Sequence, residues 1–143
     1  MQKFKYKFDS ILKVKENFKK QAMKEVAEIG KEIEEKLIKK EELISELKDC
    51  KLSSKKEIMK VSELQFVESH IYFINKKIEF VESELSRLKL LLKMKQNELV
   101  EKTKESKIFH KLKESKLLKY KREVSKEELQ MLDELAVQKS SRN

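Results

Sequence analysis

Few side chains in this sequence could support catalysis or bind a metal ion. The two histidines, His70 and His110, are forty residues apart on what reads as one long helix, so they cannot share a metal ion. The single cysteine, Cys50, has no second residue that would form a catalytic pair with it and is expected to fill apolar space. The only glycine is Gly30, so there is no glycine-rich loop to cradle phosphate. We therefore predict a protein without enzymatic activity, cofactor or metal site.

Binding chemistry is suggested instead by the distribution of charge. Lys and Arg number 35 against 26 Asp and Glu, which gives a net charge of +9. Residues 1–24 carry a net charge of +6 and residues 89–126 carry +8, whereas residues 25–50 carry −4. Two basic segments of this kind indicate a surface for an acidic partner, and a solvated charged face is an equally good interpretation.

Aromatic residues occur in two groups. Phe4, Tyr6 and Phe8 alternate with lysines, a pattern that fits either a strand or one face of a helix. A basic aromatic stretch also suits an anionic membrane surface or a nucleic acid. The second group is a candidate contact site or part of a widened core. It comprises Phe66, Tyr72, Phe73 and Phe80.

The elements that must position these residues are long helices. Between Leu64 and Leu92, apolar residues recur at spacings of three and four without a gap, which is typical of the a/d seam of a coiled coil. These residues are Leu64, Val67, Ile71, Ile74, Ile78, Val81, Leu85, Leu88 and Leu92. The same period continues, with polar positions, to Phe109. It predicts one helix from about residue 57 to about residue 122.

The first periodic segment predicts another helix, from about residue 4 to about residue 50. Its apolar residues Ile11, Val14, Phe18 and Ala22 contain an extra step of four, a stutter that would locally unwind a left-handed supercoil. A turn is expected at about residues 51–56, where Ser54 and Glu57 fit a capping box. Ser62 and Gln65 fit a second capping box, and either could start the second helix. Ser125 and Glu128 fit another capping box and predict a short helix at about residues 126–138.

The predicted fold is all-α, a single coiled-coil domain over residues 1–143 in which two long helices form an antiparallel hairpin and a short C-terminal helix follows. A turn near Ser54 would pair residues whose numbers sum to about 110, so that Phe8 lies opposite Lys102. The two basic segments then meet at the open end without stabilising each other. Residues after about 107 would have no partner in the first helix, which suggests a partner protein or self-association. One unbroken helix in a parallel dimer is the alternative fold.

The cellular compartment follows from what the sequence lacks. One cysteine excludes an intramolecular disulfide framework and suits a reducing compartment. The first ten residues are too rich in lysine to form the apolar core of a signal peptide. The apolar runs are too short to span a membrane. We therefore expect a soluble intracellular rod.

With this architecture, the chain resembles the FliJ family, coiled-coil components of the flagellar type III export apparatus. The residues that carry the resemblance are the opening Phe4, Phe8, Ile11 and Leu12 with Val14-Lys15-Glu16, the tyrosine-bearing start of the second helix, and the ending Leu132-Asp133-Glu134-Leu135-Ala136. The YscO-like secretion proteins share the same shape. The resemblance implies a non-enzymatic stalk in the cytoplasm, peripherally associated with the inner-membrane export apparatus.

The resemblance also implies partners. In the family, the end that carries both termini enters the hexameric ring of the export ATPase FliI and promotes its assembly, another part contacts the export gate FlhA, and export chaperones bind as well. The expected ring-binding residues are Phe4, Phe8, Lys13, Lys15, Lys19, Lys20, Phe109, Lys111, Leu112, Lys113 and Lys116. The expected gate-contact residues are His70, Tyr72, Phe73, Ile74, Lys77 and Val81. The alternatives are a dimeric coiled-coil adaptor and a basic coiled coil that binds nucleic acid or an anionic membrane.

Overall fold

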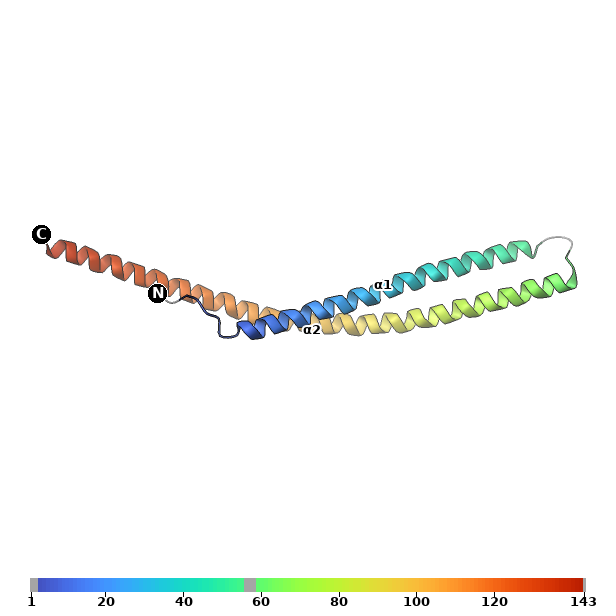
Figure 1. Cartoon of the computed structure of the whole chain (residues 1–143), viewed down its shortest axis with the longest axis horizontal. Coiled ribbons are helices and arrows are strands. Elements are labelled where there is room, and N and C mark those ends of the chain that lie inside the picture. Colours follow the sequence, from blue (N-terminus) through green and yellow to red (C-terminus); the bar gives the residue numbers. More distant parts are fainter. Residues whose placement is uncertain (1–2, 56–58, 143) are drawn as a thin grey trace. The chain divides into compact units, whose positions relative to one another are not determined.

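Two long helices make up the computed structural model, which describes residues 3–55 and 59–142. They are α1 (Asp9–Ser53) and α2 (Val61–Ser141) (Figure 1). Their contacts group the chain into two compact units. We call Met1–Lys20 with Val100–Asn143 the terminal unit, and Gln21–Leu99, which contains the connection between the helices, the hairpin unit.

The start of α1 lies several residues later than the predicted position of about residue 4. Residues 3–6 have no regular secondary structure and residues 7 and 8 form a turn. The Phe8 carbonyl accepts the first helical hydrogen bond, from the Leu12 amide at 2.9 Å, and Asp9 places a negative charge in the first turn, where the helix dipole favours it. At the other end, α1 runs through Ser53, inside the segment predicted as a turn. Residues 56–57 of that turn and capping box lie outside the described residues.

The C-terminal part of the chain is not a separate short helix. α2 continues to Ser141, and the predicted capping box at Ser125 and Glu128 lies in its interior. A capping box starts a helix only where the preceding backbone leaves the helical conformation. No proline or glycine occurs in this region to cause that break, so the hydrogen-bond ladder is maintained.

Aliphatic side chains between α1 and α2 form the core of the hairpin unit. Leu43, Ile74, Val81 and Leu85 form one buried cluster, against which the partly buried Ile33, Leu47, Cys50 and Ile78 pack. Leu88 is also fully buried. The predicted seam of α2 is therefore the one that packs, apart from its first member, Leu64, which is 40% exposed.

The seam of α1 keeps a regular alternation of three and four residues, and the predicted stutter is wrong. Ile11, Val14 and Phe18 are exposed, whereas Leu12 is 4% exposed. The buried and half-buried residues that follow this alternation are Leu12, Lys15, Lys19, Ala22, Val26, Ile29, Ile33, Lys36, Lys40, Leu43, Leu47 and Cys50. Four of these are lysines, whose aliphatic stems can cover apolar surface while their charged ends reach water or an acidic partner.

Ion pairs across the seam establish that the helices are antiparallel in each unit. In the hairpin unit, Lys36 pairs with Glu84 at 2.6 Å and Lys40 with Glu82 at 3.4 Å, and nearer the connection Glu46 pairs with His70. The numbers of these partners sum to between 116 and 122, not to about 110 as predicted. A connection centred on residue 57 accounts for part of the difference. The tilt of helical side chains toward their own N-terminus accounts for more, because it raises the sum at which long side chains of antiparallel helices meet.

Neither helix contains, within the described residues, a segment apolar enough to cross a membrane.

Candidate partner-binding surfaces

The net positive charge of the protein belongs entirely to the terminal unit. Its residues include 19 Lys and Arg against 10 Asp and Glu, a net charge of +9. The hairpin unit includes 16 of each sign and is neutral. The prediction that the two basic segments belong to one end of the hairpin agrees with this grouping, because residues 1–20 and 100–143 form a single unit.

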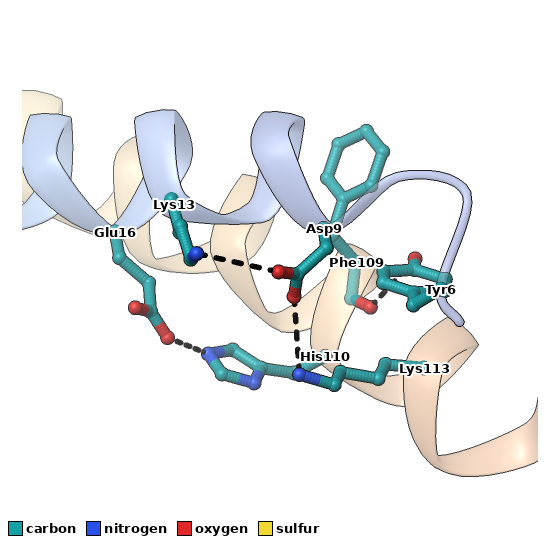
Figure 2. Close-up of polar contacts among 7 residues, drawn as sticks. All are labelled: Tyr6, Asp9, Lys13, Glu16, Phe109, His110 and Lys113. Carbon is teal, nitrogen blue, oxygen red and sulfur yellow. Dashed lines mark hydrogen bonds and ion pairs between the residues drawn. The ribbon is translucent and has the colours of Figure 1, made fainter. Parts of the chain in front are cut away.

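The segment before α1 packs along α2 through three aromatic side chains. Tyr6 is 8% exposed, and its hydroxyl donates a hydrogen bond to the backbone carbonyl of Phe109 at 3.0 Å (Figure 2). The ring centroids of Phe8 and Phe109 are 6.3 Å apart, and those of Phe4 and Tyr120 are 5.5 Å apart. All three side chains contact α2, although residues 3–6 have no regular secondary structure and residues 7 and 8 form a turn. Residues 4–8 therefore form neither the strand nor the helix that the alternation of aromatic residues with lysines suggested.

Acidic side chains hold the two basic segments of the terminal unit together. Asp9 and Glu16 are the only acids among residues 1–20, and each pairs with α2: Asp9 with Lys113 at 3.1 Å, and Glu16 with His110 (Figure 2). In the opposite sense, Lys15 of α1 donates a hydrogen bond to Glu105 at 3.1 Å. The expectation that the basic segments do not stabilise each other is therefore wrong, because a few acids are placed where the helices meet.

These contacts alter the protonation of the carboxylates. The hydrogen bond from Lys113 is the main reason that the pKa of Asp9 lies below its usual value, with the charges of Lys113 and Lys13 adding to the effect. The hydrogen bond from Lys15 lowers the pKa of Glu105 in the same way, helped by the charge of Lys102. Both carboxylates are therefore ionised at neutral pH and remain paired.

The expected ring-binding residues fall into three groups. Phe4, Phe8 and Phe109 are half-buried in the aromatic contacts described above. Lys13, Lys15 and Lys113 form ion pairs with Asp9 or Glu105, and Lys19 is half-buried at a seam position of α1. The exposed residues are Lys20, Lys111, Leu112 and Lys116. Within the described residues none of these three lysines forms an ion pair, so their charges are free to meet an acidic partner.

The expected gate-contact residues are divided between core and surface. Ile74 is 1% exposed and Val81 6% exposed, so both are core residues. Tyr72 and Phe73, at 59% and 63% exposed, and the exposed Lys77 remain available. His70 stacks on Phe66 and pairs with Glu46 at 3.3 Å. Three of the expected gate-contact residues, Phe73, Lys77 and Val81, line a shallow groove between α1 and α2. Its lining is Lys36, Lys39, Leu43, Phe73, Lys76, Lys77, Phe80 and Val81.

Both surfaces are suited to binding a protein. Exposed aromatic side chains supply contact area, and unpaired lysines supply complementarity to an acidic partner. Within residues 3–55 and 59–142, no three His, Cys, Asp or Glu side chains are placed to hold a metal ion.

Sequence reasoning missed the lysines at the seam. Lys36, Lys40 and Lys95 lie at seam positions and pair across it with Glu84, Glu82 and Glu25. The sequence pattern indicated polar seam positions in the second helix, of which Lys95 is one, but it indicated no polar seam position in the first. The sequence did contain a signal for these residues. Where the three-four alternation of apolar residues is interrupted, the seam position is a lysine, and the facing segment of the other helix contains acidic residues.

The comparison with protein families agrees with the architecture. The family described as flagellar FliJ protein matches residues 4–143, which is nearly the whole chain. No curated protein and no solved structure matches the sequence. The two-helix coiled coil and the basic terminal unit are consistent with this match. The chain therefore belongs to the FliJ family of flagellar type III export components.

Proposed function

We propose that this protein is a non-enzymatic stalk of the flagellar export apparatus whose terminal unit binds the ring of the export ATPase FliI and promotes its assembly. The observation that carries the proposal is the concentration of the whole net charge of +9 in the terminal unit. A helical unit that carries the whole net positive charge is complementary to an acidic opening, and long-range attraction would favour the approach of this unit to that opening.

The surface proposed to meet the ring is centred on Lys20, Lys111 and Lys116. These side chains are exposed, and Leu112 among them is 38% exposed and adds apolar contact area. The paired lysines Lys13 and Lys15 play a different part in this proposal. Lys15 pairs with Glu105 of α2 and helps to hold the terminal unit together, so reversing its charge would disturb the fold of this unit as well as its binding surface, whereas Lys13 pairs with Asp9 within α1.

The surface proposed to contact the export gate FlhA is on the hairpin unit. Phe73 and Phe80 are each 63% exposed and line one groove together with Lys39 and Lys77. Two exposed rings in a groove with a lysine rim fit a partner segment that carries apolar anchors beside acidic residues. We propose export chaperones as further partners on the basis of the family alone.

One experiment can test both surfaces, because each serves as the control for the other. Lys20, Lys111 and Lys116 are changed to Glu in one variant, and Phe73 and Phe80 are changed to Ala in a second. We expect the first variant to bind the export ATPase at least roughly tenfold more weakly and the gate normally. We expect the second to lose at least roughly tenfold in affinity for the gate and to bind the ATPase normally.

A charge-matched variant separates a local effect from a change in total charge. Lys31, Lys89 and Lys93 are exposed residues of the hairpin unit, and their change to Glu alters the net charge by the same amount. This variant is expected to bind the ATPase nearly as well as the unchanged protein. Equal weakening by both lysine variants would contradict the proposed surface. Circular dichroism of every variant verifies that the helices are intact.

A further inference from the structure

The last part of α2 presents apolar side chains that no part of the described chain covers. Every side chain from residue 125 to residue 142 is exposed. Leu129, Leu132 and Leu135 are 59–62% exposed, and Leu118, about two turns before this stretch, is 54% exposed. Leucines repeated on one long exposed helix are costly to leave in water, which suggests a helical partner.

Three of these leucines, Leu118, Leu129 and Leu132, belong to a second seam on α2. The residues at spacings of four, three, four, three and four are Leu118, Arg122, Ser125, Leu129, Leu132 and Ala136. At 100° per residue, this face is nearly opposite the one that carries Tyr120 and Val124, which face the segment before α1. A partner can therefore approach the second seam without displacing Phe4 from its contact with Tyr120.

The charges beside this seam identify a suitable partner. In or beside its first half lie the basic residues Lys119, Lys121, Arg122 and Lys126, and beside its second half lie the acidic residues Glu128 and Asp133. A second copy of α2 in the parallel orientation would set like charges against each other. In the antiparallel orientation, the basic block of each copy faces the acidic block of the other. We propose that residues 118–136 dock on the same residues of a second copy of this chain, in an antiparallel two-fold arrangement.

The seam positions are compatible with this symmetry. When residue numbers of the two copies sum to 254, Leu118 faces Ala136, Arg122 faces Leu132, and Ser125 faces Leu129. Each of these pairs joins an a position to a d position, as in antiparallel coiled coils. Six seam positions per copy, only three of them leucine, form an interface smaller than the roughly 1,200–2,000 Å² of stable complexes. The dimer is therefore weak, and its population depends on protein concentration and on salt.

The proposal is independent of the ring-binding and gate-contact surfaces, none of whose residues lies within residues 118–136. Its first test is analytical ultracentrifugation of the full-length protein over a wide range of concentration at low salt. We expect a monomer that becomes a dimer as concentration rises. A protein that stays monomeric at the highest concentration would overturn the proposal.

Charge reversal tests the antiparallel arrangement. One variant changes Lys119, Lys121 and Arg122 to Glu, and a second changes Glu128 and Asp133 to Lys. Each variant alone has two blocks of the same sign, so we expect its dimer to be at least roughly tenfold weaker. An equimolar mixture of the two restores attraction at both blocks and is expected to dimerise. Dimerisation of either variant alone as strong as that of the unchanged protein, or a mixture that stays monomeric, would overturn the arrangement.

Cysteine cross-linking tests orientation by a different route, in a Cys50→Ser background. An antiparallel pair places Ser125 of one copy opposite Leu129 of the other, within the distance that a disulfide can span. A mixture of Ser125→Cys and Leu129→Cys proteins is therefore expected to form a mixed disulfide faster than either protein links to itself. Preferential self-linking of the Ser125→Cys protein would indicate a parallel pair and refute the proposal.

Discussion

The hairpin unit and the terminal unit use the same helices and the same three-four alternation, but they are held together by different chemistry. In the hairpin unit the buried side chains are aliphatic, with Ile74 and Leu88 each 1% exposed. In the terminal unit they are Tyr6, Leu12 and Ser106. Hydrogen bonds, ring contacts and ion pairs join the helices there, where fewer aliphatic side chains are buried. The comparison indicates that the seam pattern alone does not determine how strongly two helices are joined.

The difference has a physical consequence for stability. Burial of aliphatic side chains is non-directional and depends little on salt, whereas exposed ion pairs contribute little and are screened. The terminal unit also concentrates like charges, which repel each other. We therefore expect the terminal unit to open at a lower free energy than the hairpin unit, which would leave its binding surface adaptable.

The largest effect is expected from a cavity in the aliphatic seam. Leu88→Ala removes a side chain that is 1% exposed, and we expect it to lower the free energy of unfolding by about 3 kcal/mol. Thermal and urea denaturation followed by circular dichroism measures this loss. Leu90→Ala is the matched control, since Leu90 is 68% exposed, and its effect should stay within about 0.5 kcal/mol. Similar losses in the two variants would mean that the seam is not the main source of stability.

A smaller effect is expected from the hydroxyl of Tyr6. Tyr6→Phe keeps the ring but removes the hydrogen bond to the Phe109 carbonyl, which should cost about 1 kcal/mol. Hydrogen exchange should become faster in residues 3–12 and in α2 near Phe109, with the hairpin unit unchanged. Tyr72→Phe, at a residue that is 59% exposed, is the matched control and should alter neither region. Equal protection of these amides from hydrogen exchange before and after Tyr6→Phe would show that the hydroxyl does not help to hold residues 3–8 against α2.

The smallest effect is expected from acid. The pKa values of Asp9 and Glu105 are lowered in the folded protein, mainly by hydrogen bonds from Lys113 and Lys15. Each carboxylate therefore contributes stability above its unfolded pKa, and this contribution is lost as pH falls through the folded value, below about 4. Because these groups are exposed to solvent, the loss is modest.

Hydrogen exchange as a function of pH can detect this loss in the terminal unit. An Asp9→Asn, Glu105→Gln variant should already be less protected at neutral pH and should lose little more on acidification. The hairpin unit contains a contrasting case, because hydrogen bonds to Glu25 and Glu98 raise the pKa of Lys95. That contribution is complete below the unfolded pKa and is lost only as pH rises above about 10.4. Protection of the terminal unit that is independent of pH would contradict the role given to its carboxylates.

The candidate sites were predicted in part. The grouping of basic segments could be read from the sequence, because charge blocks persist whatever the details of packing. Which lysines remain free could not, because Lys15 and Lys20 look equivalent until the position of Glu105 is known. Among apolar residues, the sequence likewise did not show that Ile74 and Val81 are unavailable for binding. They were assigned both to the seam and to a contact site, and burial between the helices assigns them to the seam.

The sequence by itself determined the helical fold and the seam of α2, from Ile74 to Leu88, because a three-four repeat of aliphatic residues can leave water only against another helix. Only the tertiary structure decided the seam of α1, because its seam includes lysines such as Lys36, whose stem covers apolar surface while its amino group meets Glu84 of α2. It also decided the register, through the length of the connection and the tilt of the side chains. The contact of Tyr6 with Phe109 depends in turn on that register, since residues 103 apart in the chain meet only when the helices are aligned.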